Sequence, residues 1–123
     1  MNNQFKYAII LDFEATCDDQ KKIKPQEVIE FPSVLFSLDS LEIIDQFESF
    51  VRPQHHPVLS EFCKSFTSIT QKNVDEAEVF YEVLKKYEEW LLKHKLSHEN
   101  TIIVTCGDWD LLRMFPKQCD NAK

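Results

Sequence analysis

The segment Ile9–Cys17 constrains the fold of this chain more than any other feature. Its apolar, β-prone residues carry two acids, Asp12 and Glu14, at positions i and i+2. Side chains alternate faces along a strand, so these carboxylates point one way while Leu11 and Phe13 point the other. Two carboxylates so close on a buried strand repel each other and lose solvation unless a cation lies between them. The segment therefore predicts a strand bearing a site for a hard divalent cation such as Mg²⁺, and the alternative is an edge strand with two solvated acids.

Length and composition indicate one domain with a substantial core. The chain has 123 residues, of which 43% are hydrophobic, with 10 Phe. Gly107 is the only glycine, which excludes the glycine-rich loops that bind nucleotide phosphates. The formal net charge of −7 argues against a broad nucleic-acid footprint. It leaves room for a small active site in which metal ions supply the positive charge.

Four cysteines, Cys17, Cys63, Cys106 and Cys119, are spread along the chain and form no CxxC pair. We therefore expect no zinc site. The sequence shows no signal peptide and no apolar run long enough to span a membrane. The cysteines are accordingly expected to be reduced thiols of a cytoplasmic or nuclear protein without a membrane partner.

The first half of the chain predicts three strands. They are expected over 7–12, 33–38 and 42–51, from runs of β-branched and aromatic residues. Asp39 and Ser40 are typical turn residues, so the second and third strands should form an antiparallel hairpin.

The second half predicts two helices and a fourth strand. Ser60 is the expected N-cap of a short helix over 61–66. Asp75 precedes a longer helix over about 76–95, whose apolar stripe should pack on the core. A β-branched strand over 101–105 follows. A strand that follows a long helix suggests a parallel neighbour in the sheet.

A third acid follows this last strand. Asp110 lies in Asp108–Leu112, which looks like a helix start, just past the C-terminal end of a strand expected to neighbour the first one. That is where α/β sheets place ligands and catalytic groups. Asp12, Glu14 and Asp110 are therefore candidates for one site. The alternative for Asp108 and Asp110 is charge placed at a helix N-terminus.

The order of these motifs resembles the DnaQ-like exonucleases with the DEDDh active-site pattern. Within that group the chain is similar to the branch of three-prime histone-mRNA exonucleases and enhanced-RNAi nucleases. Two acidic motifs carry the match, Leu11–Cys17 and Gly107–Asp110. Four stretches between them agree as well, namely Glu27–Val34, Phe50–Pro53, Leu59–Cys63 and Thr67–Gln71. The resemblance covers nearly the whole chain.

The resemblance implies an α/β fold of the ribonuclease H-like type, with a mixed sheet flanked by helices. It also implies metal-dependent 3′-to-5′ exonuclease chemistry on RNA, with nucleoside 5′-monophosphates as products. Asp12, Glu14 and Asp110 match three of the four catalytic acids that hold two Mg²⁺, with Mn²⁺ as an alternative. The positions that match substrate-binding residues are Phe13, Ala15, Thr16, Phe62 and Trp109.

The resemblance also implies a base-stacking role for two aromatic residues. Phe62 and Trp109 match the pair that sandwiches the 3′ base in this branch, and stacking of this kind tolerates any base. The alternative for Phe62 is a core position in its short helix. Two nearby residues, Phe66 and Ser68, stand where the branch usually has Leu and Gly. These departures bear on substrate preference and not on the fold.

The third motif of the family, a histidine followed five residues later by an aspartate, is absent after Asp110. All four histidines, His55, His56, His94 and His98, precede the second motif. His56 and His94 have an acid five residues later, and both are expected on the surface. We therefore expect residues 1–123 to be the N-terminal portion of a single exonuclease domain, truncated at its C-terminus, without the general base and the fourth acid.

The uncovered sheet would favour self-association. The expected partner is an RNA 3′ end, and the alternative function is a catalytically inactive module that binds an RNA 3′ end or a protein.

Overall fold

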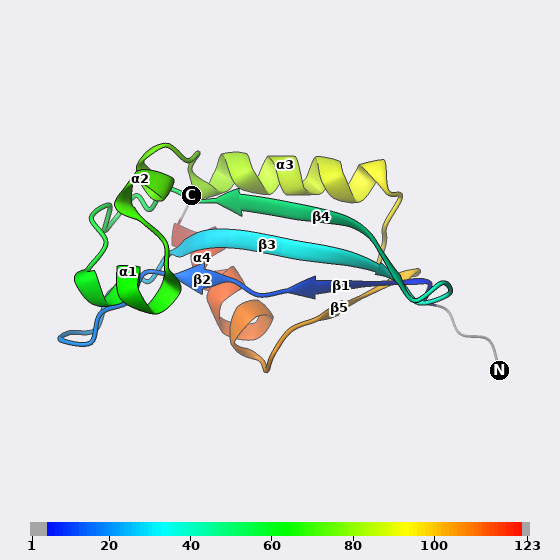
Figure 1. Cartoon of the computed structure of the whole chain (residues 1–123), viewed down its shortest axis with the longest axis horizontal. Helices are drawn as coiled ribbons and strands as arrows, with labels where there is room; N and C mark the ends of the chain where they lie inside the picture. The colour runs from blue at the N-terminus through cyan, green and yellow to red at the C-terminus, as the bar shows by residue number, and fades with distance from the viewer. Residues whose placement is uncertain (1–4, 122–123) are drawn as a thin grey trace.

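The computed structural model describes residues 5–121, which form a mixed sheet with helices packed against it (Figure 1). The elements in chain order are β1 (Tyr7–Leu11), β2 (Glu14–Ala15), β3 (Val28–Ser37), β4 (Glu42–Phe50), α1 (Glu61–Thr67), α2 (Gln71–Asp75), α3 (Phe80–Lys93), β5 (Thr101–Val104), the π-helical segment η1 (Trp109–Met114) and α4 (Phe115–Asn121). The predicted α/β class, a mixed sheet flanked by helices, is confirmed.

Strand β3 is the centre of the sheet. It pairs antiparallel with β4 along one edge and with β1 and then β2 along the other. The predicted hairpin between β3 and β4 is therefore confirmed. On the far side of β1, β5 pairs in parallel, with Ile10 opposite Val104. The helix α3 connects β4 to β5, as the predicted crossover requires.

Each of the four predicted strands ends one residue earlier than predicted, and one of them also starts earlier. The first strand ends at Leu11 and not at residue 12, and the extended chain resumes as β2. Strand β3 starts at Val28 and not at residue 33, so the predicted start is wrong by five residues. The predicted start directly follows Pro32, whereas Pro32 lies inside β3. Its register partner is Glu48 of β4, and neither β1 nor β2 pairs with it, so its missing N–H is tolerated at the break in that ladder.

The N-terminal end of the predicted long helix is also wrong. The chain instead forms the short helix α2 and then, after a break, α3 from Phe80. A reciprocal capping pair explains α2. Thr70 Oγ1 accepts a hydrogen bond from Asn73 N at 3.0 Å, and Asn73 Oδ1 accepts one from Thr70 N at 2.9 Å.

The predicted short helix is confirmed as α1. Ser60 is its N-cap, and its Oγ accepts a hydrogen bond from Cys63 N at 3.0 Å. The helix ends at Ser68, whose φ of 65° is left-handed. Glycine adopts this conformation at the least cost, which accounts physically for the preference for Gly at this position.

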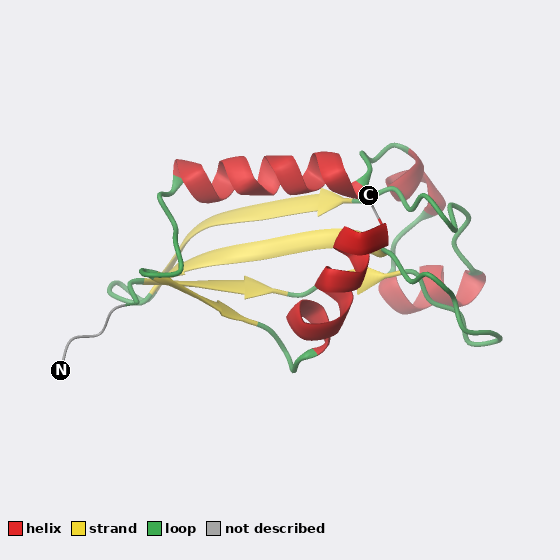
Figure 2. Ribbon diagram, turned by 180° about the vertical axis from the view of Figure 1, so that it is seen from behind, coloured by secondary structure: helices red, strands yellow, loops and turns green. Residues whose placement is uncertain are grey.

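The main core lies between one face of the sheet and α3, η1 and α4, and Figure 2 shows α4 on this face. Aromatic rings fill its centre. The ring centroids of Phe31 and Phe13 are 4.8 Å apart, and those of Phe31 and Tyr87 are 4.5 Å apart. The Tyr87 hydroxyl is satisfied by Ser33 Oγ at 2.9 Å. A smaller core lies under α1 and α2 and contains Ile29, Leu59, Cys63, Ile69 and Val74. Among the described residues, no helix combines the length and apolarity needed to span a membrane.

Candidate active site

The break between β1 and β2 carries the first two candidate acids. Leu11 and Phe13 are buried in the main core, whereas Asp12 is exposed and Glu14 is half-buried. The alternation predicted from the sequence therefore persists through the break. Both carboxylates lie on the sheet face opposite the main core.

The third acid, Asp110, reaches this break from η1. Its side chain is buried, and its Oδ2 accepts a hydrogen bond from the backbone N–H of Phe13 at 2.8 Å. Phe13 lies between Asp12 and Glu14 in sequence. The bond offsets part of the cost of burying the carboxylate. It also fixes the start of η1 against the segment that carries the other two acids.

The electrostatics of Glu14 reflect this arrangement. Burial is the largest cause that raises its pKa above the ordinary value, and the charges of Asp12, Glu30 and Asp110 raise it further. Carboxylates that repel one another in this way are stabilised either when one of them is protonated or when a cation binds between them. The structure thus brings Asp12, Glu14 and Asp110 into one negative region.

Glu30 is a member of this region that sequence reasoning missed. It is the register partner of Glu14 across β2 and β3. Burial, a side-chain hydrogen bond with Glu48 and the charges of Glu48 and Asp12 raise the pKa of Glu30 to about 7. In the sequence, Glu30 alternates with apolar residues, which indicates a position on a strand. Which residues it contacts, however, depends on strand register.

The donor set fits a divalent cation by its chemistry. Asp12, Glu14 and Asp110 offer carboxylate oxygens, which hard ions such as Mg²⁺ prefer. Their mutual repulsion, seen in the raised pKa of Glu14, would be relieved by a bound cation. Within residues 5–121, however, no three His, Cys, Asp or Glu side chains are arranged so that they could hold a metal ion. One oxygen of Asp110 is engaged by the Phe13 N–H. The fit therefore rests on the type of ligand and not on a formed coordination shell.

Three of the predicted substrate-binding residues have buried side chains. The Phe13 ring packs in the main core, and Ala15 and Thr16 are buried as well. Thr16 Oγ1 accepts a hydrogen bond from Glu27 N at 2.9 Å, and Thr16 N donates to Glu27 O at 2.8 Å. These three side chains are therefore not open to a ligand at the surface.

Glu27 is a second residue that sequence reasoning missed. Its buried carboxylate accepts backbone hydrogen bonds from Gln54 at 2.7 Å, His55 at 2.9 Å and His56 at 3.1 Å. It therefore ties the loop after β4 to Thr16 and the start of β3. In the sequence, the only indication of this role is an acidic residue next to an apolar strand.

The two predicted base-stacking residues lie on different elements. Phe62 is on α1 and Trp109 is the first residue of η1, and both are half-buried. Phe62 belongs to neither core cluster of the described residues, which disfavours the alternative of a core position. Trp109 packs in part against the main core.

The hydrogen bonds formed by histidines of the described chain do not involve the three candidate acids. His94 Nε2 lies 2.7 Å from Asp45 Oδ2, and His56 Nε2 lies 2.8 Å from Lys24 O. These two are half-buried, so the prediction of surface positions is wrong for them, because these contacts draw the rings inward. His55 and His98 are exposed.

Comparisons with known proteins show the family and the fold of this chain. The protein-family model described as "Exonuclease" (RNase_T) matches residues 9–123. The human protein "ERI1 exoribonuclease 3" is 44% identical over 118 residues, which cover 94% of this chain and 35% of that protein. The chain thus spans about a third of the length of the curated relatives it matches.

Two solved structures are similar as well. One is described as the nuclease domain of 3'hExo, a DEDDh family member, bound to rAMP; its TM-score is 0.90 at 38% identity, with 99% of this chain and 62% of that chain covered. The other is described as "3'-end specific recognition of histone mRNA stem-loop by 3'-exonuclease"; its TM-score is 0.91 at 38% identity, with 98% of this chain and 55% of that chain covered.

Proposed function

This chain belongs to the exonuclease (RNase_T) family, and from that premise we propose that it is part of a metal-dependent 3′-to-5′ exoribonuclease. The enzyme would trim RNA from its 3′ end and release nucleoside 5′-monophosphates. The observation that carries the proposal is the gathering of Asp12, Glu14 and Asp110 at the break between β1 and β2. The similarity of the whole chain to proteins named as exoribonucleases supports it.

The family is generally dependent on divalent metals. We propose Mg²⁺, as two ions, with Mn²⁺ as an alternative, held by Asp12, Glu14 and Asp110. Bound divalent ions polarise a scissile phosphate and lower the pKa of an attacking water. The hydrogen bond from Phe13 N to Asp110 Oδ2 would hold Asp110 next to the segment that carries the other two acids.

The remaining site residues would bind and orient the RNA 3′ end. The backbone of Phe13, Ala15 and Thr16 would border the terminal nucleotide, since their side chains are buried. Phe62 and Trp109 would stack on its base, which tolerates any of the four bases. An RNA 3′ end as partner is supported by the similar structure described with a histone mRNA stem-loop.

One observation favours a second function. No histidine among residues 5–121 has a hydrogen-bond partner among the candidate acids, so no general base of this type is placed there. The alternative is therefore a catalytically inactive module that binds an RNA 3′ end or a protein. In the enzyme, the base and the fourth acid would come from a part of the domain outside the described residues. We accordingly propose that residues 1–123 are the N-terminal portion of a single exonuclease domain, consistent with their 62% coverage of the similar nuclease domain.

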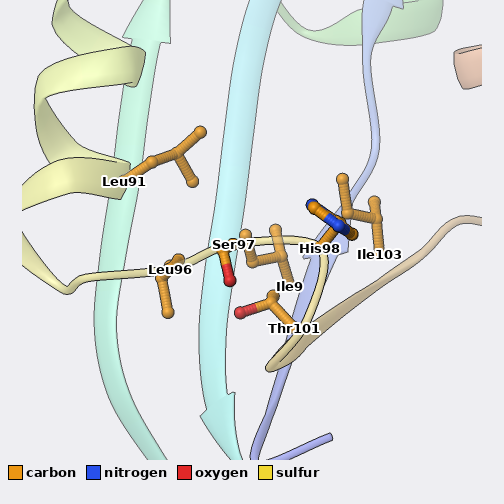
Figure 3. A pocket seen from close by; sticks show the side chains of 7 residues that line it. All are labelled: Ile9, Leu91, Leu96, Ser97, His98, Thr101 and Ile103. Atoms are coloured by element: carbon orange, nitrogen blue, oxygen red, sulfur yellow. The ribbon is translucent and has the colours of Figure 1, made fainter.

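We also propose self-association through an uncovered part of the sheet. Ile10 of β1 and Ile102 and Val104 of β5 are 47%, 42% and 44% exposed, and β5 is an edge strand. An apolar edge strand without charges is a template for pairing with another chain. On the other face of the sheet lies a separate, mostly apolar pocket (Figure 3), lined by Ile9, Leu91, Leu96, Ser97, His98, Thr101 and Ile103.

We further propose a cytoplasmic or nuclear location. Within residues 5–121 no disulfide joins the four cysteines, which is the state that a reducing compartment maintains.

The decisive experiment measures release of nucleoside 5′-monophosphates from a single-stranded RNA with a free 3′ end. Purified chain is assayed with Mg²⁺, with Mn²⁺ and with EDTA, beside the Asp12→Ala variant. Metal-dependent release that Asp12→Ala abolishes supports the enzyme. RNA 3′-end binding without release, in a folded sample, supports the binding module. Release that continues at the Mg²⁺-supported wild-type rate in EDTA, or in the Asp12→Ala variant, overturns the proposed metal site.

A further inference from the structure

Helix α1 carries a pair of stacked rings. Phe62 and Phe66 are one helical turn apart, so their side chains lie on the same face. Their ring centroids are 5.4 Å apart and the rings are nearly parallel, at 12°. This is an offset stack, an arrangement that aromatic rings prefer over direct face-to-face contact.

The outer ring of this pair is open to solvent. Phe66 is 71% exposed, and it belongs to neither of the two core clusters. Phe62, in contrast, is half-buried. An aromatic ring that is held by a neighbour and exposed to solvent is available to a planar ligand.

The stack lies next to the segment that we assign to the terminal nucleotide. Ser60 Oγ, at the start of α1, donates a hydrogen bond to Cys17 O at 2.7 Å. Cys63 Sγ, in the middle of α1, donates to Ala15 O at 3.8 Å. Both contacts fix α1 beside β2, and Figure 1 shows the helix at that end of the sheet. A strand of RNA bound at Ala15 and Thr16 would therefore pass α1.

From this geometry we propose that Phe66 is a second base-stacking position, which receives the base that precedes the terminal nucleotide of a single-stranded RNA. This inference rests on the proposed function, because it extends the proposed binding site for the RNA 3′ end from one nucleotide to two. Stacking on a phenyl ring does not depend on base identity, so the position would add affinity without sequence preference. A leucine at this position would keep apolar contact with Phe62 but offer no aromatic face.

A purely structural role for Phe66 makes a different prediction. Paired aromatic and aliphatic residues at i and i+4 stabilise a helix by modest amounts. If that were the only role, Phe66→Leu would change thermal stability slightly and leave nucleotide binding unchanged. The stacking role predicts a loss of binding that depends on the length of the ligand.

The test compares two ligands on the purified chain, with Ca²⁺ in place of Mg²⁺, so that a hard divalent cation can occupy the acids while hydrolysis is suppressed. Affinities for adenosine 5′-monophosphate and for the diribonucleotide pApA are measured for the wild type, Phe66→Leu and Phe66→Tyr. Tyr81→Leu is the matched control, since Tyr81 is also an exposed ring but lies on α3. We expect Phe66→Leu to weaken pApA binding about 5- to 10-fold and to leave monophosphate binding unchanged. Phe66→Tyr and Tyr81→Leu should behave as the wild type.

A fluorescent reporter locates the base directly. 2-Aminopurine placed at the penultimate position of an oligoribonucleotide should be quenched on binding, and Phe66→Leu should relieve that quenching. Equal pApA affinity in the wild type and Phe66→Leu overturns the inference. An equal loss of affinity for both ligands also overturns the inference, because Phe66 would then belong to the binding site of the terminal nucleotide. A wild-type chain that binds neither ligand overturns the proposed function itself, which separates the two failures.

Discussion

The backbone N–H of Phe13 donates to Asp110 Oδ2 at 2.8 Å and so joins two positions that are 97 residues apart. The bond connects the break between β1 and β2 to the first turn of η1. Asp110 therefore has two roles in the proposed enzyme. It supplies an oxygen ligand, and it holds the segment between Asp12 and Glu14 in place.

These two roles can be separated by substitution. Asp110→Asn keeps a side-chain carbonyl that can accept the Phe13 hydrogen bond, whereas Asp110→Ala removes the acceptor. Both variants should lose more than about 100-fold of metal-dependent nucleotide release, since even groups that only support a metal ligand contribute 10- to 100-fold. Only Asp110→Ala should also lose about 1–3 kcal/mol of unfolding free energy, because a buried N–H is left without a partner.

The measurements are nucleotide release, Mn²⁺ binding by calorimetry and urea unfolding. Asp108→Asn is the matched control, because that carboxylate is exposed on the same turn. Mn²⁺ binding by Asp110→Asn at wild-type affinity would remove Asp110 from the proposed ligand set.

The buried carboxylate of Glu27 leads to a second prediction. Its oxygens accept three backbone N–H groups, from Gln54, His55 and His56. In Glu27→Gln an amide NH₂ replaces one acceptor and faces these donors. We expect a loss of about 1.5–3 kcal/mol of unfolding free energy, the usual contribution of a hydrogen bond to a charged group. Urea unfolding measures it, and Gln54→Ala, which retains the backbone N–H, should unfold like the wild type. A stability loss below that of Gln54→Ala would contradict this role.

The sequence predicts the parts of the site that local rules govern. The period of two in a strand places Asp12 and Glu14 on one face, and this pattern persists through the break. The rule that ligands lie at strand ends indicates Asp110. Glu27 and Glu30 depend instead on strand register and on contacts between distant segments, which one sequence does not display. The start of β3 before Pro32 and the short helix α2 are missed, because pairing with neighbouring strands determines the first and a local capping pair determines the second.

The acid pair of Glu30 and Glu48 predicts a dependence of stability on pH. Burial first, then the hydrogen bond with Glu48, raises the pKa of Glu30 from 4.5 to about 7 in the folded chain. The folded state therefore favours the protonated carboxyl. Its contribution to stability is complete below about pH 4.5 and is lost as the pH rises through about 7.

Glu30→Gln cannot ionise, so its stability should fall less than that of the wild type between about pH 5 and pH 8. Thermal unfolding midpoints in EDTA measure this difference, and EDTA prevents a bound cation from neutralising the acids. Glu88→Gln, an exposed site on α3, is the control and should follow the wild-type profile. Parallel profiles for Glu30→Gln and the wild type would show that Glu30 ionises normally.

The exposed edge of the sheet leads to the last prediction. If β5 pairs with a second copy of the chain, a charge on that strand should prevent association, because lysine on an edge strand disfavours pairing with another strand. Ile102 is 42% exposed, so Ile102→Lys should leave the core intact. Sedimentation velocity over a range of concentrations should show association of the wild type and a monomer for Ile102→Lys. Leu92→Lys, at an exposed position on α3, adds the same charge elsewhere and should still associate. A wild-type chain that stays monomeric at every concentration would refute self-association, and equal association of both lysine variants would move the interface away from β5.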